Sequence, residues 1–186
     1  LLRDLVERFA PLKNAMERFD AAALPILGTS LSSALYPKAP FDAAAAQANL
    51  TRTEICQPAM AALGLALSEF LKELGLTPSV TLGHSLGEFV AAAAAGMLSS
   101  TDAVRLVAQR GVAMSRLALK DPGAMLAVMA DRAQVEPYLV GHADVALANH
   151  NHPTQVVLSG STAGIEAMAP IRVAGELVEG RPGGGQ

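Results

Sequence analysis

The feature that most constrains this chain is residues 79–88, which are Ser-Val-Thr-Leu-Gly-His-Ser-Leu-Gly-Glu. Residues 79–83 predict a short buried strand, and the alanine-rich stretch after Ser85 predicts a helix. Small residues at positions 83 and 87 allow a sharp strand-to-helix turn that exposes the Ser85 hydroxyl. The turn also aims the first helical N–H groups, Leu86 among them, at an oxyanion formed beside it. The pattern indicates a nucleophile for acyl transfer; the alternative is a serine that only caps a helix.

The composition favours an α/β fold of helices packed against a sheet, because 51% of the 186 residues are hydrophobic and only 4% are aromatic. The net charge of −3 offers no basic face to nucleic acid. The single Cys56 excludes an internal disulfide and suits a cytoplasmic location. We expect no membrane association, because the sequence has neither a long uncharged apolar run nor a signal-peptide pattern. Leu1 already lies in a predicted helix, so we expect the natural start to be missing.

The first two thirds of the sequence predict helices. Apolar spacing indicates one bent helix or two short ones over 2–19, where Pro11 interrupts the pattern. Further helices are predicted over 53–74, 86–95 and 101–119, and glycines at 75 and 96 end the first two of these.

The pattern changes after residue 122. Strands are predicted over 123–129, 144–148 and 154–159, and helices over 132–140 and 161–169. The order β-α-β-β-α is that of a ferredoxin-like module that lacks its last strand. We therefore predict a core over 1–122, a ferredoxin-like subdomain over 123–173 and a tail without periodicity over 174–186.

Arg110 is a candidate for binding a carboxylate. In the predicted helix 101–119 an apolar stripe of Leu106, Ala113, Met114 and Leu117 includes position 110. A buried guanidinium needs a hydrogen-bonding or charged partner. Its two parallel N–H groups suit the two oxygens of a carboxylate. The alternatives are a structural ion pair with an acid such as Glu88, or a side chain that reaches to solvent.

The remaining polar candidates carry weaker signals. Gln57, in the first turns of the helix 53–74, could contact a substrate or only bond the preceding loop. His84 directly precedes Ser85, so its side chain should diverge from the serine and not act as its base. His150 and His152 have the spacing of a metal pair but lack a third ligand, so a polar turn is favoured and no metal is predicted.

Several motifs together resemble one family. They are Gly-His-Ser-Leu-Gly-Glu at 83–88, the arginine of Gln-Arg-Gly at 109–111, Gly-Ala-Met-Leu-Ala-Val from 123, and Ala-Asn-His-Asn-His-Pro-Thr-Gln-Val-Val-Leu-Ser-Gly from 148. Over roughly residues 1–168 the sequence resembles the malonyl-CoA:acyl-carrier-protein transacylases, whose domain also serves as the acyltransferase of polyketide and fatty acid synthases. The resemblance implies an α/β-hydrolase-like large subdomain with an inserted ferredoxin-like subdomain, here truncated at its C-terminus.

The resemblance also implies roles. Ser85 would take an acyl group from a coenzyme A thioester and pass it to the phosphopantetheine thiol of an acyl carrier protein, with no bound cofactor. Arg110 matches the arginine that holds the free carboxylate of malonyl, and the Leu86 N–H matches one oxyanion donor. Gln57 and His84 match positions that line the site. Asn149 and Asn151 match a loop that borders the pocket.

Two residues bear on the acyl group. Thr53 stands where methylmalonyl-selecting members tend to have Val, and Leu86 stands where those members often have Gln. Both favour malonyl over a substituted malonyl group. The implied partners are an acyl carrier protein, malonyl-CoA and neighbouring synthase domains.

The sequence departs from the family at both ends. The family's Gln-Gly motif, which supplies a second oxyanion N–H, has no match, and residues 169–186 contain no histidine where the family places its catalytic base. Loss of a base costs roughly 10² to 10⁴ in rate. We therefore expect a fragment with little activity alone.

Two other functions remain open. A serine esterase or thioesterase shares the turn at Ser85 and needs an acid followed by a histidine, an order that Asp144 and His150 or His152 would fit. That function leaves Arg110 unexplained. The second alternative is a non-catalytic acyltransferase relic, which the missing histidine favours.

Overall fold

The computed structural model describes residues 2–117, 119–169, 172–173, 176–177 and 181–183. The chain forms two compact units, Leu1–Leu117 and Ala118–Gln186, which we call the helical unit and the sheet unit.

The described part of the helical unit contains seven helices. They are α1 (Arg3–Arg8), α2 (Ala10–Leu27), α3 (Leu31–Leu35), α4 (Ala43–Thr51), α5 (Thr53–Glu73), α6 (Leu86–Ala94) and α7 (Ser100–Ser115). The predicted pattern over 2–19 is therefore two helices, with Pro11 in the first turn of α2, where its missing N–H costs nothing. Gly75 and Gly96 follow α5 and α6 with φ of 84° and 80°, as predicted for C-terminal caps.

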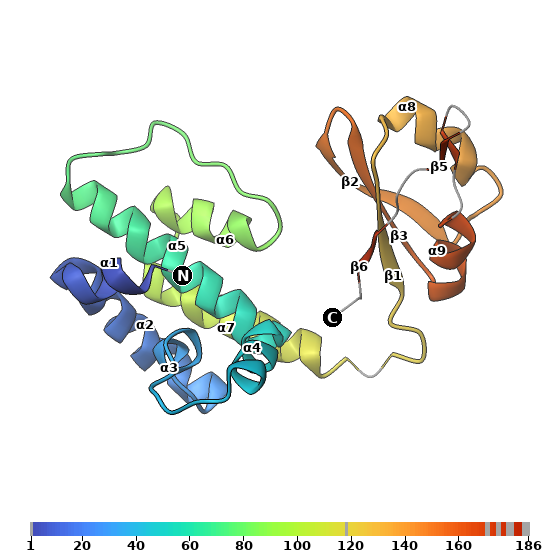
Figure 1. Ribbon diagram of the computed structural model, residues 1–186. Helices are drawn as coiled ribbons and strands as arrows, with labels where there is room; N and C mark the ends of the chain where they lie inside the picture. Colours follow the sequence, from blue (N-terminus) through green and yellow to red (C-terminus); the bar gives the residue numbers. More distant parts are fainter. Residues whose placement is uncertain (1, 118, 170–171, 174–175, 178–180, 184–186) are drawn as a thin grey trace. The chain divides into compact units, whose positions relative to one another are not determined.

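Helix α5 is the centre of the helical unit, because it packs against α2, α6 and α7. Figure 1 shows α5 and α7 running side by side. The core between the helices is filled by large apolar side chains, including Leu12, Phe19, Leu31, Leu65 and Val104. This packing fixes α5 and α7, the two helices that carry Gln57 and Arg110.

The predicted strand over 79–83 is wrong. These residues have no strand partner, and they belong to a long open loop between α5 and α6 (Figure 1). The pattern of β-branched and apolar residues is that of a strand, but a strand exists only where a neighbour accepts its backbone hydrogen bonds. The described residues of the helical unit contain no strand.

The predicted buried stripe of α7 is also wrong. Leu106 and Met114 are exposed, and the buried face carries Ala103, Val104, Val107, Ala108 and Gly111. Leu117 is also exposed and lies beyond the end of α7, which stops at Ser115 and not near residue 119 as predicted. The small residues of this second stripe allow a close approach of α5. A Cβ on Gly111 would lie 2.9 Å from the Glu54 Cα, closer than side chains tolerate. Arg110 is at the border of the buried face and is partly exposed.

The sheet unit has the predicted order of elements. They are β1 (Ala124–Val128), α8 (Arg132–Val135), the 3₁₀ helix η1 (Glu136–Leu139), β2 (Val145–His152), β3 (Gln155–Gly160) and α9 (Thr162–Met168). Strand β1 pairs antiparallel with β3, and β2 pairs antiparallel with β3. Helix α9 packs on β1 and β3, and the core between them includes Leu126, Val156, Leu158 and Ile165.

The sheet has a fourth strand where the sequence predicts a tail. Strand β6 (Arg181–Gly183) pairs antiparallel with β1 and gives the strand order β2-β3-β1-β6. The sheet therefore has one more strand than the sequence predicts. Strands β4 (Arg172–Val173) and β5 (Glu176–Leu177) form a separate antiparallel pair. Pro182 explains the missed prediction, since proline is depleted from strands and is tolerated at a sheet edge such as β6.

The two units together mix helices with an antiparallel sheet. No helix in the described ranges is both long and apolar enough to span a membrane.

Candidate active site

Ser85 lies in a strained turn immediately before α6. Its backbone has φ 53° and ψ −116°, in a region that residues with a side chain rarely adopt. Strain of this kind costs on the order of 1–3 kcal/mol and clusters at functional sites. The side chain of Ser85 is exposed.

Gly83 makes this turn possible. A Cβ at position 83 would lie 2.1 Å from the Gly87 carbonyl oxygen and 2.4 Å from the Glu88 nitrogen. Only glycine lets the incoming chain cross the first turn of α6 this closely. A Cβ on Gly87, by contrast, would meet nothing within 4 Å. Of the two glycines in the motif, Gly83 and Gly87, the turn therefore requires glycine only at position 83.

Glu88, in the first turn of α6, stabilises the turn at Ser85. The Ser85 N–H donates to the Glu88 carboxylate at 3.1 Å, and the Glu88 N–H donates to the Ser85 carbonyl at 3.1 Å. These reciprocal bonds tie the residue before the helix to its third residue. The Leu86 N–H occupies the first helical position, where an N–H has no acceptor within its helix.

Arg110 lies beside the first turns of α6. Its Cζ is 5.9 Å from the ring centroid of Phe89, which follows Ser85 by four residues. Four residues are about one helical turn, so Arg110 contacts the part of α6 that directly follows Ser85. Among the ion pairs of the described residues none involves Arg110, so the predicted alternative of a pair with Glu88 is not what the structure has.

Gln57 is the polar partner of Arg110. Arg110 Nη1 donates to Gln57 Oε1, and Gln57 Nε2 contacts Met114 Sδ at 3.4 Å. Both side chains are partly buried. The structure therefore brings together Gln57 and Arg110, two residues that were predicted separately from the sequence, near Phe89 of α6.

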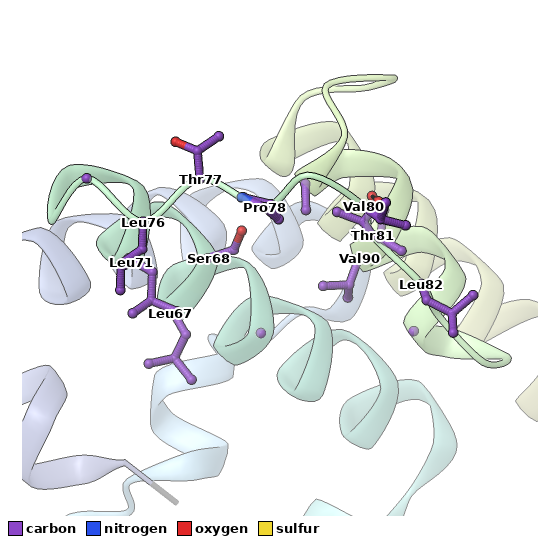
Figure 2. A pocket seen from close by; sticks show the side chains of 15 residues that line it. Leu67, Ser68, Leu71, Leu76, Thr77, Pro78, Val80, Thr81, Leu82 and Val90 are labelled. Atoms are coloured by element: carbon purple, nitrogen blue, oxygen red, sulfur yellow. Dashed lines mark hydrogen bonds between the residues drawn. The ribbon is translucent and has the colours of Figure 1, made fainter.

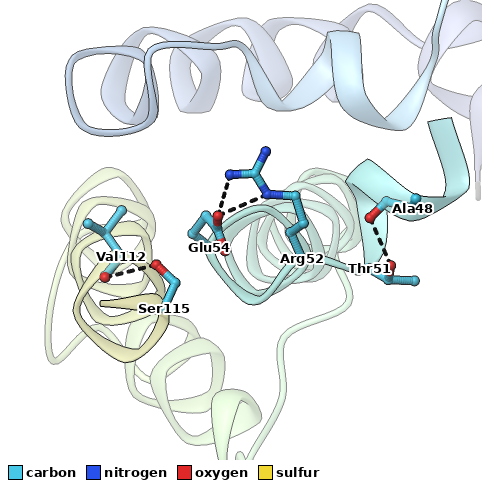
Figure 3. A network of polar contacts seen from close by, with 6 residues as sticks. All are labelled: Ala48, Thr51, Arg52, Glu54, Val112 and Ser115. Atoms are coloured by element: carbon cyan, nitrogen blue, oxygen red, sulfur yellow. Dashed lines mark hydrogen bonds and ion pairs between the residues drawn. The ribbon is translucent and has the colours of Figure 1, made fainter. Parts of the chain in front are cut away.

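The start of α5 lies close to α7 at Gly111 and carries a local ion pair. Gly111 lies against the backbone of Thr53 and Glu54. Figure 3 shows Arg52 folded over Glu54, with Arg52 Nε donating to Glu54 Oε1 at 2.9 Å. Hydrogen bonds from its own backbone N–H and from Arg52 hold the pKa of the Glu54 carboxyl below its usual range. This arrangement sets the spacing between Gln57 and Arg110.

His84 is exposed and precedes Ser85 in the same loop. It is the only histidine of the helical unit, because the other three are His142, His150 and His152. No imidazole other than that of the adjacent residue is therefore available to Ser85 from within its own unit.

Asn149 and Asn151 lie in the strand β2, not in a loop as the resemblance implied. Asn149 pairs with Val157 next to a register shift in the β2–β3 ladder, and Asn151 Nδ2 donates to Gln155 Oε1 at 3.5 Å. Both asparagines belong to the sheet unit.

The contacts of the other polar candidates are structural. His152 Nδ1 accepts from the Thr154 N–H at 3.2 Å, in the turn between β2 and β3. The Asp144 carboxylate accepts from the Ser161 hydroxyl at the start of α9, and this bond holds the pKa of Asp144 below its usual range. The Asp144 carboxylate therefore binds Ser161, the N-cap residue of α9. Within the described ranges no three His, Cys, Asp or Glu side chains gather to hold a metal ion.

Glu88, Phe89 and Met114 were not predicted as site residues from the sequence. Phe89 carries a usable signal, since it lies at i+4 from Ser85 and therefore on the same side of the helix. Met114 lies at i+4 from Arg110 by the same rule.

The chain is similar in sequence to known acyltransferases. The chain is 36% identical over 139 residues to a malonyl CoA-acyl carrier protein transacylase of Synechocystis, which covers 69% of this chain and 46% of the relative. It is 39% identical over 127 residues to the transacylase of the same name from Bacillus subtilis, covering 66% of this chain and 40% of the relative. The chain thus spans less than half the length of these relatives.

Solved structures give the same result. The crystal structure of the Synechocystis malonyl-CoA:ACP transacylase matches with a TM-score of 0.78 and 31% identity, covering 98% of this chain and 56% of that one. A malonyl-transacylase in complex with a type II polyketide synthase acyl-carrier protein matches with a TM-score of 0.78 and 28% identity, covering 99% of this chain and 58% of that one. The acyl transferase domain family matches residues 3–174. This chain therefore belongs to the acyl transferase domain family.

Proposed function

We propose that the chain carries the nucleophile and the carboxylate-binding half of a malonyl-CoA:acyl-carrier-protein transacylase. The observation that supports this most strongly is the contact of the Arg110 guanidinium with Phe89 of α6, four residues after the strained Ser85. A serine hydrolase needs no cation at that position, whereas a malonyl group carries a carboxylate at the end opposite its thioester. The names of the relatives agree with this substrate.

The proposed reaction has two half-reactions. The Ser85 oxygen attacks the thioester carbonyl of malonyl-CoA, the carbon–sulfur bond breaks, and the serine proton passes through a base to the coenzyme A sulfur. The malonyl group is then held as an ester on Ser85. The phosphopantetheine thiol of an acyl carrier protein attacks this ester, and its proton returns to the Ser85 oxygen. The chain needs no bound cofactor for either step.

The site residues have separate roles in this proposal. The Leu86 N–H donates to the oxyanion that forms at the thioester carbonyl. Arg110 binds the malonyl carboxylate with its guanidinium, and Gln57 orients that guanidinium. His84, Asn149 and Asn151 line the site, and Thr53 and Leu86 favour malonyl over a substituted malonyl group.

We also propose which subdomain of the transacylase each unit belongs to. The helical unit belongs to the larger, α/β-hydrolase-like subdomain, and the sheet unit is the ferredoxin-like subdomain. The order β2-β3-β1-β6 of an antiparallel sheet, with α9 packed on β1 and β3, supports the second assignment. Cleavage of the acyl-enzyme is expected to be slow in the 186-residue chain, since His84 alone supplies an imidazole to the helical unit.

The test is covalent labelling of Ser85. The purified chain is incubated with malonyl-CoA or acetyl-CoA, and the acylated peptide is identified by mass spectrometry, with Ser85→Ala as the control. We expect malonyl on Ser85, little acetyl, and neither on the variant. Equal labelling by both thioesters would favour an esterase, and no labelling by either would favour a non-catalytic relic.

A further inference from the structure

Phe89 on α6 places its aromatic ring beside the guanidinium of Arg110 on α7. The Arg110 Cζ is 5.9 Å from the centroid of the ring. An aromatic face attracts a cation that lies within about 6 Å of its centroid. Both side chains are partly buried, and burial strengthens this attraction because less water surrounds the charge. The ring is therefore a second partner of the guanidinium, in addition to the Gln57 amide.

The contact between Phe89 and Arg110 does not follow from neighbouring positions in the sequence. Arg8, for example, also lies over an aromatic ring, but over that of the next residue, Phe9. Phe89 and Arg110 come from different helices, and the packing of α6 against α7 brings them together. The fold itself therefore sets this contact.

Phe89 also faces away from the apolar groove between α5 and α6. Figure 2 shows Val90 of α6 at that groove, together with Leu67 and Leu71 of α5. The residues of α6 that line the groove are Gly87, Val90, Ala91 and Ala94. Their spacing of three and four residues places them on one face of the helix. At about 3.6 residues per turn, position 89 lies on the opposite face, so filling the groove is not the role of its ring.

Gln57 and Phe89 bind the guanidinium in different ways. Gln57 accepts a hydrogen bond from Arg110 Nη1, whereas the ring attracts the positive charge and uses no N–H group. Among the described residues Arg110 forms no other hydrogen bond, so its remaining N–H groups are open to a carboxylate. An acidic side chain in the place of Phe89 would occupy those groups and neutralise the charge. The ring holds the cation without competing with a substrate carboxylate.

We propose that Phe89 is a positioning residue, which holds the Arg110 guanidinium in place for the carboxylate of a malonyl group. This inference rests on the proposed function, in which Arg110 binds that carboxylate. A free arginine side chain has many rotamers, and ordering it on binding lowers the affinity. Phe89 and Gln57 order it beforehand. The benefit is limited to acyl groups that carry a carboxylate, and an acetyl group has none.

Phe89→Leu tests this role, because leucine keeps an apolar side chain on α6 and removes the aromatic face. The rate of Ser85 labelling is measured by mass spectrometry over a range of malonyl-CoA and acetyl-CoA concentrations. We expect the malonyl-CoA concentration that gives half the maximal rate to rise about three- to tenfold. The maximal rate and the acetyl labelling should change little. Phe89→Tyr keeps the ring and should therefore keep the natural ratio of malonyl to acetyl labelling.

Phe70→Leu is the matched control. Phe70 lies on α5, and its ring centroid is 5.1 Å from that of Phe9. The same substitution there removes an aromatic ring from the helical unit without touching Arg110, so the ratio of malonyl to acetyl labelling should be preserved.

The contact itself is read by NMR, independently of the reaction. An aromatic ring shifts the resonances of nearby protons, so the Arg110 Nε–H resonance should move in Phe89→Leu and stay in place in Phe70→Leu. An unmoved resonance in Phe89→Leu would overturn the proposal. It is also overturned if Phe89→Leu keeps the natural half-maximal malonyl-CoA concentration, or lowers malonyl and acetyl labelling equally, because the ring would then only support the fold.

Arg110→Ala distinguishes the two proposals. If Arg110→Ala loses the preference for malonyl and Phe89→Leu keeps it, only the role of Phe89 fails. If Arg110→Ala keeps the preference, Arg110 does not bind the carboxylate, and the positioning role of Phe89 fails together with that part of the proposed function.

Discussion

Arg110 on α7 donates from Nη1 to the amide oxygen of Gln57 on α5. The two residues are far apart in sequence, and the small residues at the α5–α7 contact bring them together. The neutral amide occupies part of the guanidinium fork without neutralising its charge. A substrate carboxylate can therefore compete for the fork, which an acidic partner in the same place would prevent.

Arg110→Ala should remove the preference for a carboxylated acyl group. The hydrogen bonds that a charged group forms contribute about 1.5–3 kcal/mol, so malonyl labelling of Ser85 should fall roughly 10- to 100-fold. Acetyl labelling should change little. Both are measured by mass spectrometry at matched thioester concentrations.

Arg105→Ala is the control for this loss of charge. Arg105 lies on the same helix but pairs with Asp102 at 3.0 Å on an exposed surface. Its removal should leave the ratio of malonyl to acetyl labelling unchanged. If Arg110→Ala also preserves that ratio, Arg110 does not bind the carboxylate.

Gln57→Glu should lower malonyl labelling by placing a competing carboxylate on Arg110. The glutamate side chain is nearly the same size as that of glutamine, so the fold should persist. We expect about a tenfold loss, which corresponds to ~1.4 kcal/mol. Gln109→Glu adds the same charge at an exposed position of α7 and should cause a much smaller change. Malonyl labelling that stays at the natural level in Gln57→Glu would contradict the role of Gln57 as the partner of Arg110.

Sequence patterns predicted the local features of this chain well, because those features depend on neighbouring residues. Pro11, Gly75 and Gly96 marked helix boundaries, and the Gly83–Ser85 spacing predicted the turn before α6. Each of these signals acts within one or two turns of the chain. The pairing of Gln57 with Arg110 required the α5–α7 packing, which no local pattern contains.

Two predictions failed for physical reasons that concern distant partners. The strand over 79–83 has the right residues but no neighbouring strand in the described residues. On α7 the larger side chains of Leu106 and Met114 suggested the buried face, yet the helix buries Ala103, Ala108 and Gly111 together with two valines. Close helix contacts select small residues, so hydrophobic size alone points to the wrong side.

Gly83→Ala should damage the turn at Ser85. The new Cβ would meet the Gly87 carbonyl oxygen at 2.1 Å, so the loop or α6 must move. Overpacking of this kind costs about 1–3 kcal/mol. We expect a lower urea midpoint, followed by far-UV circular dichroism, together with loss of Ser85 labelling.

Gly87→Ala is the matched variant within the same motif. A Cβ at position 87 meets nothing within 4 Å, and α6 would gain the helix propensity of alanine, up to about 1 kcal/mol. Stability should therefore stay the same or rise. Equal destabilisation by the two alanines would show that the close contact at Gly83 does not control the turn.

The sheet unit should lose stability at low pH through Asp121 and Asp144. Asp121 accepts from the Thr162 hydroxyl and N–H and from the Gly123 N–H, and these bonds hold the pKa of its carboxyl below the usual range. The bond from Ser161 lowers the pKa of Asp144 in the same way. Both carboxylates bind the start of α9, so their protonation weakens the attachment of that helix.

The sign of the pH dependence follows from the lowered pKa values. A carboxyl whose pKa is lower in the folded state than the ~3.9 of an unfolded aspartate stabilises the fold fully above that value. The stabilisation is lost as the pH falls through the lower, folded-state pKa. Amide resonances of β1 and β3 should therefore show unfolding that steepens below about pH 4. Asp121→Asn should flatten this dependence, whereas Asp131→Asn, at the cap of α8, should preserve most of it. An unchanged acid transition in Asp121→Asn would mean that the contacts of Asp121 do not stabilise the sheet unit.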